Sequence, residues 1–155
     1  MDRGTRKATE PDLGVLATRL LFGLQSELFR RSAEEGFADL RPRHGAVTAY
    51  LDANGLRQSE LTRLAGRNKQ TIGVIIDELE ALGYVERVPD PADRRAKLIM
   101  PTARGLRLME LSDRIVADIE TRYAARVGRQ AYEQFFQTLA ALTAPSATED
   151  DPAHD

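Results

Sequence analysis

The sequence predicts a mostly α-helical protein with one small antiparallel β-hairpin, and three observations lead to this fold class. Most of the chain carries apolar residues at spacings of three and four, which gather them on one side of a helix. Between residues 84 and 100 the spacing changes to two, which is typical of β-strands. Glycine and proline divide the chain into blocks of helical length. At 155 residues, the chain has the length of one domain.

The first predicted helix covers about residues 12–34 and has two apolar sides. One side carries Leu13, Leu16, Leu20, Leu24 and Leu28. The other carries Val15, Phe22 and Phe29 at heptad spacing. A helix with two apolar sides has to be covered twice, so we expect one side to pack within its own domain and the other against a second copy of the chain. The alternative is a central helix inside a monomeric bundle.

Two short helices are predicted next, followed by a tight turn. Pro42 suits the first turn of a helix that Gly55 ends. A second helix covers about residues 58–65, with Leu61 and Leu64 facing inward. The segment Gly66-Arg67-Asn68 then predicts a tight connection, because glycine suits the left-handed end of a helix and asparagine suits the N-cap of the next one.

The helix after this turn covers residues 69–82 and is closed by Gly83. Its apolar residues lie within about a third of the helical wheel and are Ile72, Ile75, Ile76, Leu79 and Leu82. The opposite side carries Gln70, Gly73, Val74 and Asp77. Residues 84–88 and 96–100 follow as two strands, and the polar residues 89–95 between them predict an exposed hairpin tip.

Two more helices are predicted to complete the chain. Pro101-Thr102 opens a long helix over about residues 103–125, and Gly128 separates it from a last helix over 129–142. The last helix has an apolar side made of Tyr132, Phe135, Phe136 and Leu139. We expect a flexible N-terminal tail over residues 1–11 and a disordered acidic tail over 144–155, which contains proline and no aromatic residue.

Charge is distributed unevenly along the chain. The formal net charge is −2, but residues 57–107 carry +3 and residues 108–155 carry −5. A positive middle segment suggests one surface that faces an anionic partner.

Several classes of function are excluded or disfavoured by composition. The chain has no cysteine, which removes disulfides, thiolate metal sites and thiol redox sensing. No stretch approaches the roughly 20 apolar residues of a membrane span, and the N-terminal residues show no apolar segment of a secretory signal. None of the common nucleotide, hydrolase or zinc-protease motifs is present. With only His44 and His154 available, we expect no metal site, no cofactor and no enzyme activity.

The two short helices over 58–82 and the hairpin after them predict a winged helix-turn-helix. A helix can enter the major groove of DNA when its outer face lacks bulky apolar or strongly acidic side chains. Residues 68–71, Asn-Lys-Gln-Thr, lie at the helix start, where free N–H groups suit phosphates. Gln70 could bond an adenine edge and Val74 could contact a thymine methyl group. Gly73 would allow a close approach of the helix to the groove.

The predicted wing offers a second contact with DNA. Arg94 and Arg95 lie side by side at its tip, and an arginine on a protruding loop can enter the narrow minor groove. The carboxylate of Asp93 could fix a neighbouring guanidinium by a bidentate pair. In isolation, such a segment would be interpreted as a solvated turn. Its position between two strands, directly after a helix-turn-helix, favours the DNA-binding interpretation.

The chain resembles the MarR family of bacterial transcriptional regulators over about residues 12–143. The resemblance lies in Glu60-Leu61-Thr62, in residues 68–85, in the wing segment Asp90 to Arg95, and in Pro101-Thr102-Ala103-Arg104-Gly105. The wing of this family has an aspartate followed two residues later by an arginine, which here are Asp93 and Arg95.

The resemblance implies a homodimer whose two DNA-binding lobes, about residues 41–101, read a palindromic operator. The helices at about 12–35 and 103–143 would form the dimerisation region. By similarity, Arg95 would enter the minor groove, Asp93 would orient it, and Arg94 and Lys97 would contact phosphates. The residues that would face the bases are Asn68, Lys69, Gln70, Thr71, Gly73 and Val74.

Four positions depart from the family pattern. Gly73 and Val74 stand where the family often has threonine and arginine, which changes the expected base contacts. Pro101 replaces a leucine before a helix entrance. Arg57 stands where an N-cap hydroxyl is common, so the helix that follows is expected to be poorly capped.

The resemblance also implies that a small anionic or aromatic ligand releases the DNA. Arg41, Arg43, His44 and Tyr50 are the candidate ligand contacts, although a surface or dimer-interface position is the usual one for a histidine such as His44. The sequence therefore predicts a cytoplasmic repressor whose partners are double-stranded DNA, a second copy of itself and a small effector. A winged-helix module that binds protein and not DNA is the alternative, and the basic wing argues against it.

Overall fold

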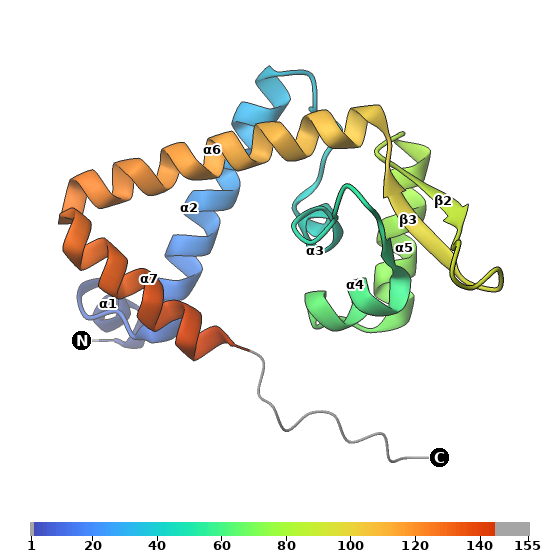
Figure 1. The fold of residues 1–155 in the computed structure, drawn as a ribbon. Helices are drawn as coiled ribbons and strands as arrows, with labels where there is room; N and C mark the ends of the chain where they lie inside the picture. The colour runs from blue at the N-terminus through green and yellow to red at the C-terminus, as the bar shows by residue number, and fades with distance from the viewer. Residues whose placement is uncertain (1, 145–155) are drawn as a thin grey trace, which may run out of the picture. The chain divides into compact units, whose positions relative to one another are not determined.

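The computed structural model describes residues 2–144 and shows a mostly helical chain with one small antiparallel sheet, as predicted (Figure 1). The elements in chain order are α1 (Arg3–Thr9), α2 (Leu13–Glu34), the 3-10 helix η1 (Pro42–His44), α3 (Gly45–Thr48), β1 (Leu56–Arg57), α4 (Gln58–Ala65), α5 (Lys69–Ala81), β2 (Val85–Pro89), β3 (Lys97–Pro101), α6 (Ala103–Val127) and α7 (Arg129–Thr143).

The chain divides into two compact units, Met1–Val116 and Ala117–Asp155, and the boundary falls inside α6. The first unit contains the sheet and the helices from α1 to α5, together with the first half of α6. The described part of the second unit consists of the rest of α6 and α7. No helix in residues 2–144 is long and apolar enough to cross a membrane.

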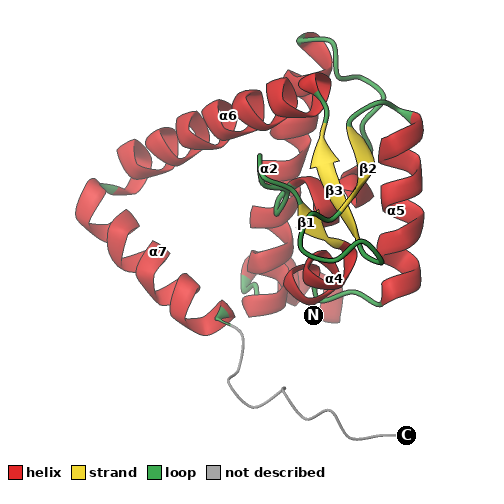
Figure 2. Ribbon diagram, turned by 45° about the vertical axis from the view of Figure 1, so that its right-hand side comes forward, coloured by secondary structure: helices red, strands yellow, loops and turns green. Residues whose placement is uncertain are grey.

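The sheet has three strands in the order β1-β3-β2, and both pairings are antiparallel (Figure 2). Val85 pairs with Pro101 and Pro89 with Lys97, so β2 and β3 form the predicted hairpin, with each strand lying one residue later than predicted. The strand β1 was not predicted. Its two residues, Leu56 and Arg57, pair with Ile99 and Leu98, and a strand of two residues has no periodicity that a sequence could reveal.

The core of the first unit lies where α4, α5 and the sheet meet. Ile72, Ile75, Ile76 and Leu79 are buried on one side of α5, as the periodicity predicts. Leu61 of α4 and Ile99 of β3 are buried as well, with at most 1% of their surface exposed. Burial of a side chain of this size contributes about 1.5–3 kcal/mol, so this cluster fixes α5 and the wing within one lobe.

The start of α6 is held against the hairpin. The Thr102 hydroxyl donates a hydrogen bond to the Gly83 carbonyl (2.6 Å) and accepts one from the Gly105 N–H (3.1 Å), which caps the helix. A Cβ atom added at Gly105 would lie 2.1 Å from the Tyr84 carbonyl oxygen, so only glycine fits there. This contact gives a structural reason for the Thr102 and Gly105 motif.

The structure corrects two predicted boundaries and agrees with the prediction for the start of α4. The helix expected from Pro42 to Gly55 is wrong in length, since α3 ends at Thr48 and the chain then turns, with the Gly55 N–H bonded to the Asp52 carbonyl (2.9 Å). Part of the expected N-terminal tail forms the helix α1. Helix α4 has no N-cap side chain, as expected, but Glu60 accepts a hydrogen bond from the Arg57 N–H (3.2 Å) and partly replaces it.

The helices α2 and α7 each keep several large apolar side chains exposed. On α2, Leu13, Leu16, Leu21 and Phe22 are 50–77% exposed. No residue of α7 is buried, and Phe135, Phe136, Leu139 and Leu142 are 37–74% exposed. Within the second unit, the Tyr132 hydroxyl bonds to Glu120 of α6 (3.3 Å) and its ring contacts Phe135 and Phe136. These faces of α2 and α7 are not covered within residues 2–144. The expected disordered tail from residue 145 onward lies outside the described residues.

Candidate nucleic-acid interface

The turn between α4 and α5 is built as the sequence predicts. Gly66 ends α4 in the left-handed conformation, with φ +59°. The Asn68 carboxamide oxygen then accepts a hydrogen bond from the Thr71 N–H (2.8 Å) and caps α5. Lys69, Gln70 and Thr71 are all exposed in the first turn after this cap. The start of α5 is therefore ordered and open to an approaching molecule.

The outward side of α5 combines polar residues with one large apolar side chain. Val74 is 52% exposed, on the side of the helix opposite to the buried isoleucines. Gln70 precedes it by one turn and Asp77 follows it by three residues, so the three side chains share a face. This face therefore offers an amide, a methyl-bearing side chain and a carboxylate to solvent.

Gly73 is positioned differently from what we expected. A Cβ atom added there would lie 3.2 Å from the Gln58 side-chain nitrogen, so this side of α5 is turned toward α4. The Gln58 amide donates a hydrogen bond to the Lys69 carbonyl (3.1 Å) and thereby links the two helices of the motif. The absence of a side chain at Gly73 leaves room for Gln58, which is a reason for the glycine that does not involve DNA.

A cluster that the sequence did not suggest joins α5 to β2. The Arg87 guanidinium binds Asp77 and Glu80, each at 2.5 Å, and the Arg87 N–H also donates to Glu80 (3.2 Å). Burial lowers the pKa of Arg87, but the hydrogen bonds that its guanidinium donates to Asp77 and Glu80 outweigh burial, and its net pKa is raised. Arg87 is thus cationic and shared between two carboxylates.

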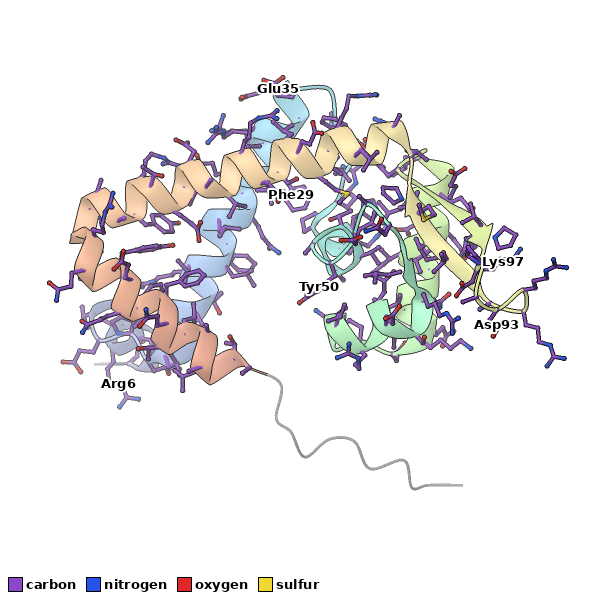
Figure 3. The ribbon with its side chains drawn as sticks, in the orientation of Figure 1. Arg6, Phe29, Glu35, Tyr50, Asp93 and Lys97 are labelled. Carbon is purple, nitrogen blue, oxygen red and sulfur yellow. The ribbon has the colours of Figure 1, made fainter. Side chains whose placement is uncertain are left out.

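The wing tip presents its basic residues to solvent. Arg94, Arg95 and Lys97 are exposed, and Figure 3 shows Asp93 and Lys97 at the hairpin that projects from the sheet. Within residues 2–144, neither the Arg94 nor the Arg95 guanidinium has a hydrogen bond or an ion pair. Asp93 does not orient the Arg95 guanidinium here, since its carboxylate accepts from the Arg95 backbone N–H (3.0 Å). Asp93 therefore shapes the turn from which the arginine projects.

A buried ion pair anchors the base of the wing, and sequence reasoning missed it. Asp90 is 6% exposed and binds the Arg57 guanidinium, with 2.6 Å between the carboxylate and Nε. The second carboxylate oxygen accepts from the Ala92 N–H (2.8 Å). The Ala96 N–H closes the tip by donating to the Asp93 carbonyl (2.9 Å). The Asp-Pro pair at the end of the strand was the one available sequence signal.

The wing anchor predicts a pH effect on stability. The Ala92 N–H, and after it the Arg57 guanidinium, hold the pKa of Asp90 below its ordinary value. A carboxylate with a lowered folded-state pKa stabilises the fold above its unfolded-state pKa, and this contribution is lost as the pH falls through the folded-state value. We expect Asp90→Asn to unfold at lower urea concentration at pH 7, with the difference from the unsubstituted protein shrinking toward pH 3. A difference that stays constant with pH would contradict the ionic role.

Two of the four candidate ligand contacts, the buried His44 and the exposed Arg43, bind Glu78 of α5. His44 is 2% exposed, so the expected surface or interface position is wrong. Its Nδ1 accepts from the Arg41 N–H (3.0 Å), and its Nε2 lies 3.0 Å from a Glu78 carboxylate oxygen. Arg43 donates to both oxygens of Glu78 (2.7 and 2.8 Å). The hydrogen bonds from Arg43 and His44 hold the pKa of Glu78 below its usual range, against partial burial.

The other two candidates are open to solvent. Arg41 is exposed, and Tyr50, labelled in Figure 3, is 43% exposed. The structure does not gather the four candidates into one cavity. His44 links η1 to α5 because both of its ring nitrogens have partners, and it has no ring nitrogen left for a ligand.

A second missed cluster joins the segment after α2 to the start of α6. Burial raises the pKa of Asp39, but the hydrogen bonds that its carboxylate accepts from the Tyr84 hydroxyl (2.5 Å) and from Arg104 (3.0 Å) outweigh burial, and the net pKa is lowered. Burial, and then the hydrogen bond to Asp39, raise the pKa of Tyr84. The Arg104 guanidinium also lies 4.3 Å from the centre of the Tyr84 ring and donates to the Leu82 carbonyl (2.6 Å). This cluster fixes the α6 start to the hairpin.

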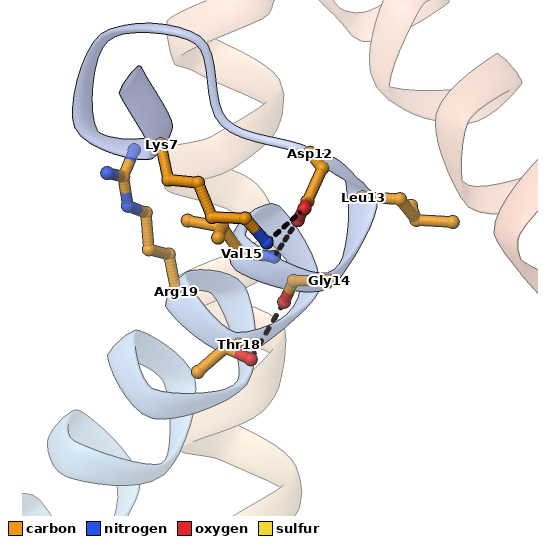
Figure 4. Close-up of a pocket in the computed structure, with 7 residues that line it drawn as sticks. All are labelled: Lys7, Asp12, Leu13, Gly14, Val15, Thr18 and Arg19. Atoms are coloured by element: carbon orange, nitrogen blue, oxygen red, sulfur yellow. Dashed lines mark hydrogen bonds and ion pairs between the residues drawn. The ribbon is translucent and has the colours of Figure 1, made fainter. Parts of the chain in front are cut away.

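A pocket of about 650 Å³ lies at the start of α2, away from the residues proposed for ligand binding (Figure 4). Its lining residues are Lys7, Asp12, Leu13, Gly14, Val15, Thr18 and Arg19. Lys7 is paired with Asp12, and the Asp12 carboxylate also caps α2 through the Val15 N–H (3.0 Å). No group of histidine and carboxylate side chains suited to a metal ion occurs among residues 2–144.

Comparison with known proteins gives one consistent result. A model of the MarR family matches residues 38–96, which include α4, α5 and the wing tip. The transcriptional regulator HosA of Escherichia coli O111:H- is 27% identical over 99 residues, or 64% of this chain and 73% of HosA.

Two solved structures of the regulator CouR have a similar fold over most of their length. CouR from Rhodococcus jostii RHA1 bound to p-coumaroyl-CoA has a TM-score of 0.71 and 29% identity, covering 89% of this chain and 96% of that one. The transcriptional repressor CouR bound to a 23-mer DNA duplex has a TM-score of 0.69 and 26% identity, covering 88% of this chain and 94% of that one.

Proposed function

Because the chain belongs to the MarR family of winged-helix transcriptional regulators, we propose that it binds a palindromic DNA operator as a homodimer and represses transcription. One observation carries the proposal. The open start of α5 and the unpaired arginines of the wing tip belong to the same lobe, whose core is well packed. The packed core then fixes the position of α5, which would enter the major groove, relative to the wing arginine that would enter the minor groove.

The DNA-contacting residues under this proposal belong to two groups. Lys69, Gln70, Thr71 and Val74 face bases, with Asn68 and Gly73 shaping the helix that carries them. Arg95 enters the minor groove, Asp93 shapes the tip, and Arg94 and Lys97 contact phosphates. Their exposure in the lobe, about residues 41–101, supports these roles.

The homodimer is proposed from the uncovered apolar faces of α2 and α7. Both helices carry large apolar side chains that are more than half exposed. Exposure of such a patch to water is unfavourable for a monomer. A second copy would cover them through the regions 12–35 and 103–143. The two α5 helices would then reach successive major grooves, about 34 Å apart.

Binding to random duplex DNA followed by selection and sequencing tests the proposal. We expect an enriched inverted repeat whose half-sites are one helical turn apart. Affinity for that duplex should fall steeply with salt, by about a thousandfold between 50 and 200 mM for six or more neutralised phosphates. Fluorescence anisotropy at a series of salt concentrations measures this slope. Recovery of no repeat, or an affinity that is insensitive to salt, would refute operator binding.

We further propose that an aromatic, anionic compound releases the DNA, and that the protein acts in the cytoplasm, where such an operator would be found. The structure of CouR with p-coumaroyl-CoA supports this class of ligand. Arg41, Arg43 and Tyr50 are the candidate contacts that are exposed, although Arg43 is paired with Glu78, whereas His44 is buried against Glu78.

A further inference from the structure

We propose that Arg87 is a positioning residue for DNA binding, because it neutralises two carboxylates on the helix that would enter the major groove. The proposal rests on the operator binding proposed above. It concerns a residue of β2 that lies outside the wing tip and outside the first turns of α5.

The need for neutralisation follows from the residues of α5 itself. Asp77 lies three residues after Val74 on the exposed side of the helix, and 68% of its side chain is exposed. Glu80 follows after three more residues, with 42% of its side chain exposed. Two free carboxylates on this face would repel the phosphates on either side of the groove, since charges closer than about 10 Å are poorly screened at 0.1 M salt.

The geometry of Arg87 meets this need. One terminal nitrogen binds Asp77 and the other binds Glu80, so a single guanidinium serves both carboxylates. Only 27% of the Arg87 side chain is exposed, which keeps the cation between the helix and the sheet. The Arg87 N–H bond to Glu80 adds a backbone anchor, so the two carboxylates are also held to β2.

The consequence is a coupling between the two DNA-reading parts of the lobe. Arg87 lies opposite Ile99 in the hairpin that carries Arg94 and Arg95, and it is bonded to the helix that carries Gln70 and Val74. It thus lowers the negative potential on the helix from a position on the hairpin. This effect does not require Arg87 to contact DNA.

A double-mutant cycle on the full chain tests the proposal, with the duplex enriched by selection as the probe. At 50 mM salt, Arg87→Gln should weaken binding by about tenfold, because two carboxylates become unpaired. The variant with Asp77→Asn and Glu80→Gln should change binding by about twofold or less, because its carboxylates were already neutralised. Adding these two substitutions to Arg87→Gln should restore affinity to within about twofold of the original.

The outcomes separate the possible roles of Arg87. Restored affinity in the triple variant supports neutralisation, and so does a loss for Arg87→Gln that shrinks at high salt. A triple variant as weak as Arg87→Gln would overturn the proposal, because it would mean that Arg87 contacts DNA itself or is needed only for packing. An Arg87→Gln variant that binds normally would overturn it as well.

Two controls keep the test decisive. If Arg87→Gln unfolds, the triple variant alone still answers the question, since it carries none of the three charges and should bind as the original does. Circular dichroism melting curves report the fold of each variant. If the unsubstituted protein binds no duplex at all, operator binding itself is refuted. If it binds the duplex but Arg87→Gln binds equally well, only the role of Arg87 is refuted.

Discussion

Replacing Arg95 with alanine is expected to weaken binding to the selected operator by about 1–3 kcal/mol, which is roughly a ten- to hundredfold loss. The arginine lies at the tip of a projecting hairpin and has no partner within the described residues, so its whole guanidinium is available to the minor groove. Because no internal ion pair is broken, the melting temperature of the protein should not change. Fluorescence anisotropy with the operator duplex measures the loss.

The variant Arg107→Ala provides a matched control for Arg95. Arg107 is another exposed arginine, but it lies on α6 and outside the lobe, so its removal should alter affinity by less than about twofold. Equal losses for the two variants would indicate general charge attraction and not a wing contact. Unchanged affinity for Arg95→Ala would disprove the assignment of the wing.

Replacing Phe136 with glutamate is expected to dissociate the proposed homodimer. Phe136 is 51% exposed on the apolar side of α7, and a carboxylate buried without a partner at an interface costs several kcal/mol. Sedimentation velocity at micromolar concentration should then show a species of 17.2 kDa in place of one of twice that mass. Affinity for the palindrome should fall by at least about a hundredfold, because one lobe alone binds one half-site.

The control for this prediction lies on the same helix. Gln134 is exposed on the other side of α7, and Gln134→Glu adds the same charge away from the apolar face. It should leave both the mass and the affinity unchanged. A 17.2 kDa mass for the unsubstituted protein, or a dimer that survives Phe136→Glu, would show that α7 does not form the interface.

The parts of the lobe that depend on neighbouring residues could be predicted from the sequence. The cap of α5 needs only Asn68 and Thr71, three residues apart, and the buried side of α5 needs only the spacing of its isoleucines. The hairpin was located because alternating residues flank a polar tip. Each of these signals is complete within a short segment, so periodicity and local chemistry are sufficient.

The contacts that fix the site could not be predicted, because their partners lie far apart in the sequence. Arg57 and Asp90 are separated by 33 residues, and Arg104 and Asp39 by 65. The sequence predicts a surface or dimer-interface position for His44, because nothing near it in the chain indicates Glu78, which is 34 residues away. Acidic and basic residues are both common on any protein surface, so the sequence gives no reason to choose these pairs over others.

The contact between Gln58 and Gly73 limits how this protein could be re-engineered. A side chain at position 73 would bring its Cβ atom within 3.2 Å of the Gln58 amide nitrogen, so Gln58 would have to shift by a few tenths of an ångström to make room. That shift would disturb the hydrogen bond by which Gln58 holds the Lys69 carbonyl at the start of α5. Substitutions at position 73 should therefore be designed together with the residue at position 58.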